Sequence, residues 1–561
     1  MKLTQNSKIL IILIIAHINL FPINLWGKDE IDLNINLLLN YYHKTSNYTQ
    51  KYLSNLLNEE TNAQSKSIKK ENANKKDLKR ILLIGGSIWL ADSIRYWKEY
   101  TSWIEDWQFN LNWKDQSERF FTLHANKFDS NPFLTNILHN FAGTFFYDLA
   151  RYHNLNLFES LMCNIISSLA WEYITEWREV ISINDNLSNI SGGFVMGETS
   201  YQLGNFLLNK QGIFNNILGY ILNPVFAFND LLGGKKIRKA NTYNNLSNFS
   251  AFLTISNKNI RLDKNGESHN LLRINFHSNL SGFPVLEETD KNNKSGFIKF
   301  PFYSGMDFDI SLKNSEVEEL GLNAKVIYLG YYKQNLKKEK NGFLKGQYFF
   351  IGMSSAYSLY KKRAVEEYDK GEYHYDFTGE EKPEQPVNFT DKHSIMDLIG
   401  PSFYYGNCFS HITIKTDITA YLDFGLINSL ALNTYSEKHD IFSPRMKTTL
   451  IYYGYYYALG YTVESNSELS ISNLSFYNRL RYRKFNSIQG LDRFQYLVKD
   501  DSKVTDSRFE LWTSLIYKIP RTNFFFSFSY EKINRSGTIH NTLVKQTENR
   551  VYISLGIKFI Q

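Results

Sequence analysis

Four ionisable residues at helical spacing are the part of this sequence best suited to chemistry. Glu172 and Glu176 are one helical turn apart, so both carboxylates could reach one ion or one proton. His139 and Asp185 supply an imidazole and a further carboxylate, the residue types used in acid/base catalysis and in metal binding. We take these four as candidate catalytic residues and expect neither a metal nor a cofactor.

The same residues also fit a buried hydrogen-bond network without a catalytic role. In this hypothesis Arg151 pairs with Glu172 or Glu176, and His139 bonds to Asp185. The further members expected in the network are Tyr147, Ser168, Asn189 and Glu198. Three hypotheses therefore stay open for the polar residues: a catalytic site, a structural network, or a face that binds a partner or lines a lumen.

Predicted helices must position these side chains. Asn131-Pro132 begins the first helix, which runs to about His153. The second covers 157–179 and the third 184–208, and a looser apolar helix ends at Asn223-Pro224. Polar residues recur every four positions on each of the first three helices, between apolar residues. We therefore expect a narrow polar stripe on each of these helices, with the stripes facing one another.

The order of motifs in this helical segment resembles the bacterial domain-of-unknown-function family 3943. The motifs are Asp129–Pro132 (DSNP), His139 with Gly143, Tyr147 and Arg151, Ser168–Glu176 (SLAWEYITE), Ser182–Asp185 (SIND), Gly192-Gly193 and Gly197-Glu198. The resemblance covers a helical segment at about 125–225 of the 561 residues. Since the family has no established activity, the resemblance implies membership but no reaction.

From about residue 245 apolar and polar residues alternate, which is typical of β-strands with two different faces. The same pattern recurs in 412–424, 524–530 and the last strand, where the apolar series is Val551, Ile553, Leu555, Ile557 and Phe559. Repeated strands with one apolar face predict a transmembrane antiparallel β-barrel of about 12 strands, following an N-terminal α-helical domain. We expect short turns at Gly406–Phe409, Glu464–Glu468 and Pro520–Asn523, and long loops at 361–391, 425–445, 487–507 and 534–547.

The N-terminus predicts export. Lys2 and Lys8 precede an apolar run at Ile9–Ile15, and the small residue Gly27 comes before a polar stretch. We therefore divide the chain into a signal peptide (1–27), a short helix and disordered polar linker (28–80), a helical domain (81–240) and an outer-membrane β-barrel (241–561).

The composition excludes several classes of protein. Charged residues make up 21% and hydrophobic residues 43%, which fits neither a wholly disordered chain nor a polytopic helical membrane protein. The aromatic fraction of 16% suits the girdles of a membrane barrel. A net charge of +7 without a clustered basic face gives no support for nucleic-acid binding. The two cysteines, Cys163 and Cys408, are too few for a disulfide framework.

Together these patterns predict a bacterial outer-membrane protein whose N-terminal region is periplasmic or inside the barrel lumen. The expected partners are outer-membrane lipid and the barrel insertion machinery, and the ligand is unknown. The first functional hypothesis is a pore, transport or structural envelope barrel, with the helical domain as plug or periplasmic cap. The alternative is an enzyme that acts on lipid or envelope glycan through the Glu/His/Asp cluster, and a third hypothesis has the long loops bind a partner. A water-accessible cleft beside the lipid face would favour the enzyme. A closed cluster would favour a scaffold, and a plugged lumen would favour transport.

Overall fold

The computed structural model describes residues 76–100, 109–129, 133–210, 212–232, 248–262, 268–282, 293–298, 303–338, 344–362, 390–436, 454–488 and 503–560. The predicted signal peptide and short N-terminal helix lie outside these residues, as does the linker up to residue 75.

Helices occupy the first part of the described chain. The α-helices are α4 (Leu78–Tyr100), α5 (Trp113–Phe121), α6 (Phe133–Tyr152), α7 (Leu157–Ala170), α8 (Ile183–Leu187), α9 (Gly193–Leu208), α10 (Ile213–Leu222) and α11 (Pro224–Leu231). The shorter elements are the 3-10 turn η3 (Leu123–Ala125), the π-helical turns η4 (Trp171–Thr175) and η5 (Ser188–Gly192), and the parallel pair β1 (Asn126–Lys127) and β2 (Ile181–Ser182). Local sequence explains where α7 begins, because Asn156 and Glu159 cap each other's backbone N–H in a capping box. The helices expected from the polar stripes agree with α6, with α7 plus η4, and with α8 to α9.

Twelve antiparallel strands form a closed barrel in the second part of the chain. They are β3 (Asn248–Leu262), β4 (Ser268–Ser281), β6 (Tyr303–Lys313), β7 (Glu316–Lys338), β8 (Leu344–Lys362), β9 (Lys392–Phe409), β10 (Ile412–Ile427), β11 (Tyr456–Ile471), β12 (Leu474–Ser487), β13 (Val504–Lys518), β14 (Phe524–Ile539) and β15 (Thr542–Ile560). Each pairs with the next, and β15 pairs with β3, so the ring closes on itself. The short β5 (Asn293–Ile298) extends the pairing of β7 beyond β6. The prediction of an antiparallel barrel with about 12 strands is confirmed.

The strand ends differ from the prediction in three places. β9 continues to Phe409 and β11 runs through Glu464–Glu468, where we expected turns. β14 and β15 meet at a tight turn at His540 and Asn541, within the stretch predicted to be a long loop. In the second and third places the cause is that charged side chains such as Glu464 and Arg535 point into the barrel, where both form ion pairs. Polar sequence in these stretches therefore marks the lumen and not an exposed loop.

Alternation along each strand distinguishes the outside of the barrel from its inside. On β10, Ile418 and Leu422 are exposed, whereas the residues that follow them, Thr419 and Asp423, are fully buried. The last strand follows the same rule, because Ile553 and Leu555 are exposed while Ser554 is buried. The wall is thus apolar on its outer face and polar on its inner face, as predicted.

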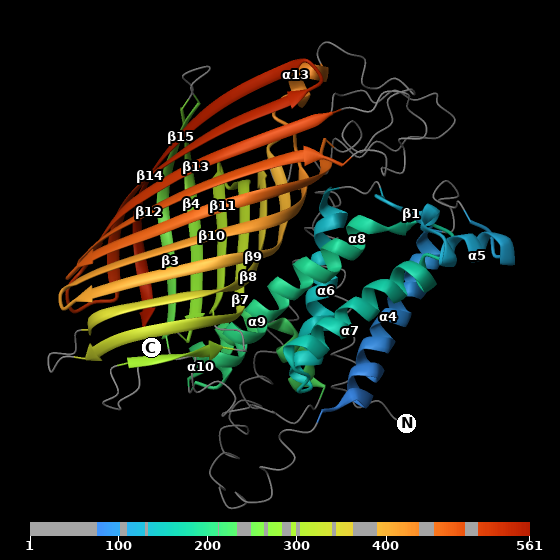
Figure 1. Cartoon of the computed structure of the whole chain (residues 1–561), viewed down its shortest axis with the longest axis horizontal. Helices are drawn as coiled ribbons and strands as arrows, with labels where there is room; N and C mark the ends of the chain where they lie inside the picture. The colour runs from blue at the N-terminus through green and yellow to red at the C-terminus, as the bar shows by residue number, and fades with distance from the viewer. Residues whose placement is uncertain are drawn as a thin grey trace, which may run out of the picture.

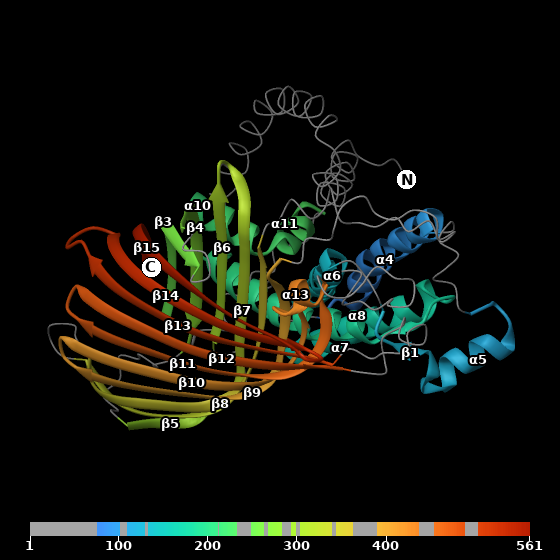
Figure 2. The same ribbon diagram turned by 90° about the horizontal axis from the view of Figure 1, so that it is seen from above.

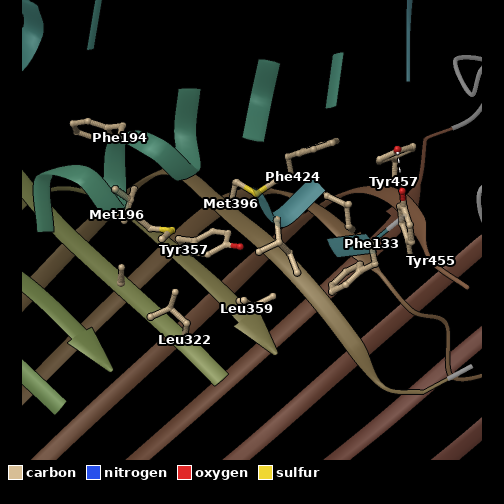
Figure 3. Packing of buried hydrophobic residues seen from close by; sticks show 14 of the residues in the cluster. Phe133, Phe194, Met196, Leu322, Tyr357, Leu359, Met396, Phe424, Tyr455 and Tyr457 are labelled. Atoms are coloured by element: carbon tan, nitrogen blue, oxygen red, sulfur yellow. Dashed lines mark hydrogen bonds between the residues drawn. The ribbon is translucent and has the colours of Figure 1, made fainter. Parts of the chain in front are cut away.

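The helices pack against the outer face of this wall (Figures 1 and 2). Phe424 and Leu426 continue the outward-facing series of β10 beyond Leu422, yet both are fully buried. They belong to an apolar cluster shared by the helices and the barrel (Figure 3). Its helical members include Phe128, Phe133, Ile137, Phe194, Val195 and Met196, and its barrel members include Leu322, Val326, Tyr357, Leu359, Met396, Tyr455 and Tyr457.

A second apolar cluster continues the contact towards the end of the barrel where the chain enters and leaves it. Leu203 and Leu207 of α9 and Leu222 of α10 pack there against Phe249 and Ala251 of β3, and against Leu280 of β4. The helices between Leu78 and Leu231 therefore pack on the outside of the wall.

A segment of the barrel itself enters the lumen. Residues 428–436, which include the short helix α13 (Leu432–Ser436), fold inward after β10. Ala431, Leu432 and Tyr435 are buried against inward-facing residues of the wall, namely Ile395, Ile427, Tyr456, Ala458, Phe485, Val504 and Ile539. This inward segment narrows one mouth of the barrel.

Candidate functional site

Glu172 lies in the π-helical turn η4 and is fully buried. Its Oε2 accepts a hydrogen bond from the backbone N–H of Ser182 at 2.7 Å, while its Oε1 has no hydrogen-bond partner among the described residues. Burial, followed by the nearby charges of Glu176 and Asp185, raises the pKa of Glu172 well above its ordinary value. Burial therefore favours the protonated form of this carboxyl group, the form that can donate a proton.

Two further carboxyl groups next to Glu172 are shifted in the same direction. Burial raises the pKa of Glu176 to about 8, with the charge of Asp185 as the second cause. The indole N–H of Trp171 donates to Glu176 Oε1 at 2.8 Å. Burial likewise raises the pKa of Glu179 to about 8, and the hydroxyl of Tyr96 donates to that carboxyl group. These groups can store protons at neutral pH.

His139 faces Asp185 across the interface of α6 and α8, with 3.4 Å between Nε2 and Oδ1. Asp185 Oδ1 also accepts from the side-chain amide of Asn184 at 2.9 Å, so it is fixed in place. His139 is the more accessible partner, with 19% of its side chain exposed against 2% for Asp185. A carboxylate that orients an imidazole in this way is a common acid/base arrangement. The structure thus brings His139, Glu172, Glu176 and Asp185 together, and we name these four the carboxyl cluster.

The carboxyl cluster has one buried cation that the sequence did not indicate. Arg119 on α5 is fully buried, and its guanidinium donates to four backbone carbonyls. The acceptors are the carbonyl oxygens of Glu179 at 2.8 Å, Tyr173 at 3.0 Å, Glu176 at 2.9 Å and Glu172. A π-helical turn and the helix end after it leave carbonyls without helical partners, and Arg119 supplies those partners. No spacing rule links Arg119 to the motifs, because it lies before the predicted helices.

Arg151 lies in a different place from the one we predicted. Its Nε and Oε2 of Glu198 are 2.9 Å apart, and its guanidinium also stacks over the ring of Tyr201 at 4.2 Å. Tyr147 donates to Glu198 Oε2 at 2.6 Å, and Gln202 donates to Oε1. We name Tyr147, Arg151, Glu198 and Gln202 the Glu198 cluster.

The expected pair of Arg151 with Glu172 or Glu176 is therefore wrong, and helix geometry explains why. The short connection after α6 makes α7 run back along it, so Arg151 lies near the beginning of α7. Glu172 follows the other end of α7. The 14 residues from Phe158, in the first turn of α7, to Glu172 span about 21 Å along the helix axis at 1.5 Å per residue. The single predicted network is thus divided into two clusters.

Amide and hydroxyl groups fill the space between the two clusters. Asn164 of α7 donates to the carbonyls of Asn189 at 2.8 Å and Ile190 at 3.3 Å, both in the π-helical turn η5. Ser168 donates to Asn186 at 2.8 Å. Asn189 is itself buried, as is Ser168. Both π-helical turns therefore have carbonyls that side chains from other elements satisfy.

Hydrogen bonds connect the carboxyl cluster to the barrel wall. Asn184 donates to Asn136 Oδ1 at 2.8 Å, and Asn136 in turn donates to the hydroxyl of Tyr455 at 2.9 Å. Asn140 donates to the hydroxyl of Tyr357 at 3.3 Å. The tyrosines lie more than two hundred residues further along the chain, so no local pattern could predict them as partners.

The lumen holds a second group of charged side chains. Glu319 of β7 pairs with Lys258 of β3 and with Arg550 of β15, the latter at 3.4 Å. Asp391, just before β9, pairs with Arg508 of β13 at 2.8 Å and with Arg535 of β14 at 3.0 Å. None of these pairs joins neighbouring strands of the ring, so the charges cross the lumen.

Among the described residues, no group of three or more His, Cys, Asp or Glu side chains is arranged to hold a metal ion. Cys163 and Cys408 are both free thiols.

Comparison with known proteins gives one family and several barrels. The family described as "Domain of unknown function (DUF3943)" matches residues 125–225. No curated protein matches the chain. The solved structures found include the NanC porin, at 8% identity and a TM-score of 0.23, with 55% of this chain and 100% of that chain covered. The KdgM porin in complex with disordered oligogalacturonate is 9% identical with a TM-score of 0.19, and 55% of this chain and 99% of that chain are covered. The β domain of the Bordetella autotransporter BrkA is 8% identical with a TM-score of 0.21, and 56% of this chain and 100% of that chain are covered.

These TM-scores add nothing to what the β-pairing already shows. The family match falls on the segment that holds the carboxyl cluster and the Glu198 cluster, and it confirms the resemblance seen in the motifs. The chain therefore combines a helical segment that the family model of DUF3943 matches with a closed antiparallel barrel of twelve strands.

Proposed function

We propose that this protein is an outer-membrane barrel for the passage of small polar solutes or ions, and that the structure is its closed form. The observation that carries the proposal is the set of ion pairs across the lumen, centred on Glu319 and on Asp391. The inward segment 428–436 narrows one mouth in addition.

Charges inside the barrel favour transport over a purely structural role. Removing charged groups from water is costly, and replacing a buried ion pair by well-packed apolar residues is often neutral or stabilising. A barrel selected only for stability would therefore gain nothing from charges at positions such as Lys258, Glu319 and Arg550. A path for polar solutes, in contrast, requires polar and charged groups along its wall.

The proposed membrane location rests on the outer face of the wall. The exposed apolar residues on β10 to β15 include Ile414, Ile418, Leu422, Leu459, Leu480, Leu515, Phe526, Phe528, Ile553 and Leu555. A monomeric water-soluble protein rarely exposes an apolar band of this extent. The basic and apolar N-terminus supports export of the chain.

Conductance of the refolded protein in a planar lipid bilayer tests the closed-pore proposal. We expect the wild-type protein to be nearly silent. The triple variant Lys258→Ala, Glu319→Ala, Arg550→Ala removes the ion pairs centred on Glu319. Glu548 and Glu531, which also pair with Arg550, keep Lys362 and Arg479 as partners. The variant should conduct when combined with replacement of 429–436 by a short Gly/Ser linker. Leu543→Ala, on the outer face, serves as the matched control and should stay silent.

Two results would contradict the proposal. A wild-type protein that conducts as an open pore would show that the ion pairs do not close the lumen. Silence of the combined variant, with a correctly folded barrel, would exclude transport and leave the structural role.

A second candidate function is an enzyme that acts on lipid or envelope glycan. The observation that favours it is the pairing of a partly exposed imidazole, His139, with a buried Asp185, close to the protonated Glu172. In that function His139 would act as general base and Glu172 as general acid.

Mass spectrometry of outer-membrane lipids and glycans from cells that express the protein tests the enzyme. A product that appears with the wild type and is lost in both His139→Gln and Glu172→Gln would support it. Identical lipid and glycan profiles for cells with and without the wild-type protein would rule it out.

A further inference from the structure

The helical domain has the burial pattern of a protein surrounded by lipid. On α7 the polar residues Ser160, Asn164 and Ser168 are buried, whereas Phe158 and Ile166 are 64% and 65% exposed. A helix at a water interface shows the reverse, with its apolar stripe towards the core and its polar stripe towards solvent. The polar stripe of α7 faces the other helices, and its apolar stripe faces outward.

Two further helices show exposed apolar stripes. On α10 the stripe comprises Ile213, Phe214, Ile217 and Ile221, each more than half exposed. On α4 it comprises Leu82, Leu83, Leu90 and Ile94, again each more than half exposed. Scattered single apolar residues at a surface need no explanation, but three helices that each turn an apolar stripe outward do.

Charged residues are absent from the middle of each of these helices. The uncharged runs are 81–91 in α4, 160–171 from α7 into η4, and 213–222, the whole of α10. At 1.5 Å per residue each run extends about 15–18 Å, roughly half the thickness of a bilayer's hydrocarbon core. Charged residues flank the runs, among them Arg80 and Asp92 on α4.

Aromatic residues with polar tips gather beyond the ends of the runs in α4 and α7. Trp97 donates from its indole N–H to the carbonyl of Thr175 at 2.8 Å, and Trp171 donates to Glu176. Tyr96 packs edge-on against Trp171. Such residues are enriched at the boundary between hydrocarbon and water.

The helical domain also adjoins the face of the barrel that we propose to contact lipid. It covers Phe424 and Leu426 of β10, and Ile418 and Leu422 follow on the same strand face without cover. The outer wall therefore passes directly from a surface that contacts helices to an exposed apolar surface.

From these observations we propose that α4, α7 and α10 lie in the hydrocarbon layer of the membrane and bind acyl chains of lipid with their exposed apolar stripes. The inference rests on the proposed membrane location of the barrel. Among the described residues no helix is long and apolar enough to cross a membrane. The helices instead enter the layer beside the barrel and are held there by the apolar clusters and by the hydrogen bonds to Tyr357 and Tyr455.

Spin-label accessibility in phosphatidylcholine vesicles tests the proposal on the full chain. Single cysteines are introduced in a Cys163→Ser, Cys408→Ser background and labelled with a nitroxide. The test positions are Ile166→Cys on α7 and Ile217→Cys on α10, so that failure of one variant to fold leaves the other. Leu555→Cys on the outer wall of β15 and the exposed Lys114→Cys on α5 serve as lipid and water references.

We expect the labels at 166 and 217 to relax more strongly with apolar oxygen than with a water-soluble nickel chelate, as at 555, and the opposite at 114. Labels at 166 and 217 that respond to the nickel chelate, or to neither reagent because protein covers them, overturn the inference while 555 still reports lipid. A label at 555 that responds to the nickel chelate instead shows that the proposed membrane location itself is wrong.

Discussion

Arg151 and Glu172 respond to mutation in different ways if each has the partners seen in the structure. Arg151→Met leaves the Glu198 carboxylate buried without its cation, which should cost about 3–5 kcal/mol of unfolding free energy. Glu172→Gln replaces a protonated carboxyl by an amide of the same shape that can still accept from Ser182, so we expect little change. Urea titration of the full chain by tryptophan fluorescence measures both, because only Trp512 of the nine tryptophans lies in the barrel. Equal losses of unfolding free energy in the two variants would instead support a pairing of Arg151 with Glu172 and contradict the structure.

The buried carboxyl groups make the stability of the helical domain depend on pH. Burial raises the pKa values of Glu176 and Glu179 to about 8 in the folded protein, above the ordinary value of 4.5. Between these values the folded state binds more protons than the unfolded state, so stability falls as pH rises from about 4.5 to 8. Each group contributes at most about 1.4 kcal/mol per pH unit.

Glu179→Gln should reduce this dependence on pH. The variant removes one of the titrating groups, so the same urea titrations at pH 5 and pH 8.5 should differ less than for the wild type. A helical domain that is more stable at pH 8.5 than at pH 5 would contradict the protonated state of these carboxyl groups.

Residue spacing could predict the members of the carboxyl cluster but not all of their partners. His139, Glu172 and Asp185 stand out because polar residues are rare on otherwise apolar helices. Arg119 does not, because its role is to donate to backbone carbonyls and no sequence pattern reports where carbonyls are free. The partner of Arg151 was predicted wrongly because it depends on which end of α7 lies beside it.

The crossing of α6 with α9 and η5 depends on glycines that allow close backbone contact. A Cβ atom on Gly143 would lie 2.0 Å from the carbonyl oxygen of Asn189, so Gly143→Ala requires the helices to separate. We expect a loss of more than about 2 kcal/mol, as for overpacking of a core. Gly86→Ala on α4 is the matched control, because a Cβ there meets nothing within 4 Å, and it should stabilise by about 0.5–1 kcal/mol. Differential urea stability of the two variants decides the point, and a tolerated Gly143→Ala would show that the helices do not cross as described.

The outward face of β15 should tolerate arginine near the end of the strand but not within the apolar band. Leu555→Arg places a charge in the apolar band and should cost about 2–4 kcal/mol. Leu543→Arg lies on the same face but beyond the band, next to the turn at His540, and should cost about 0–1 kcal/mol. Refolding equilibria into lipid vesicles measure both, and equal costs would show that the band does not contact lipid. Ser554 on the opposite face would be unsuitable for this comparison, because it is buried against Ser256.

Alternation was sufficient to predict the strands but not their ends. Period-2 patterns at 412–424 and 524–530 lie within β10 and β14, as expected. The turns were placed wrongly where charged residues such as Glu464 and Arg535 face the lumen. A charged residue suits a polar lumen and an exposed loop equally well, so the sequence alone does not distinguish them. Only the pairing of the strands distinguishes the two environments.

The position of the helical domain on the barrel was outside the reach of sequence reasoning. Phe424 and Leu426 contact helices, while Ile418 and Leu422 on the same strand face are exposed, yet all four are apolar residues in one alternating series. An outward face that contacts lipid and one that contacts an apolar helix require the same residue types. The family match at 125–225 likewise identifies the helical segment without saying where it docks.

Photo-crosslinking from the barrel wall tests the docked arrangement most directly. Tyr357→p-benzoylphenylalanine places the reactive group on the outward face of β8, next to Asn140 of α6. After irradiation of the membrane-inserted protein, proteolysis and mass spectrometry should find residue 357 joined to a peptide of α6 or α9. The same group at Leu480, on the exposed face of β12, and at Tyr360, inside the lumen, should give no such product. Crosslinks to the helices from position 360 and none from 357 would place the helical domain inside the barrel and contradict this account.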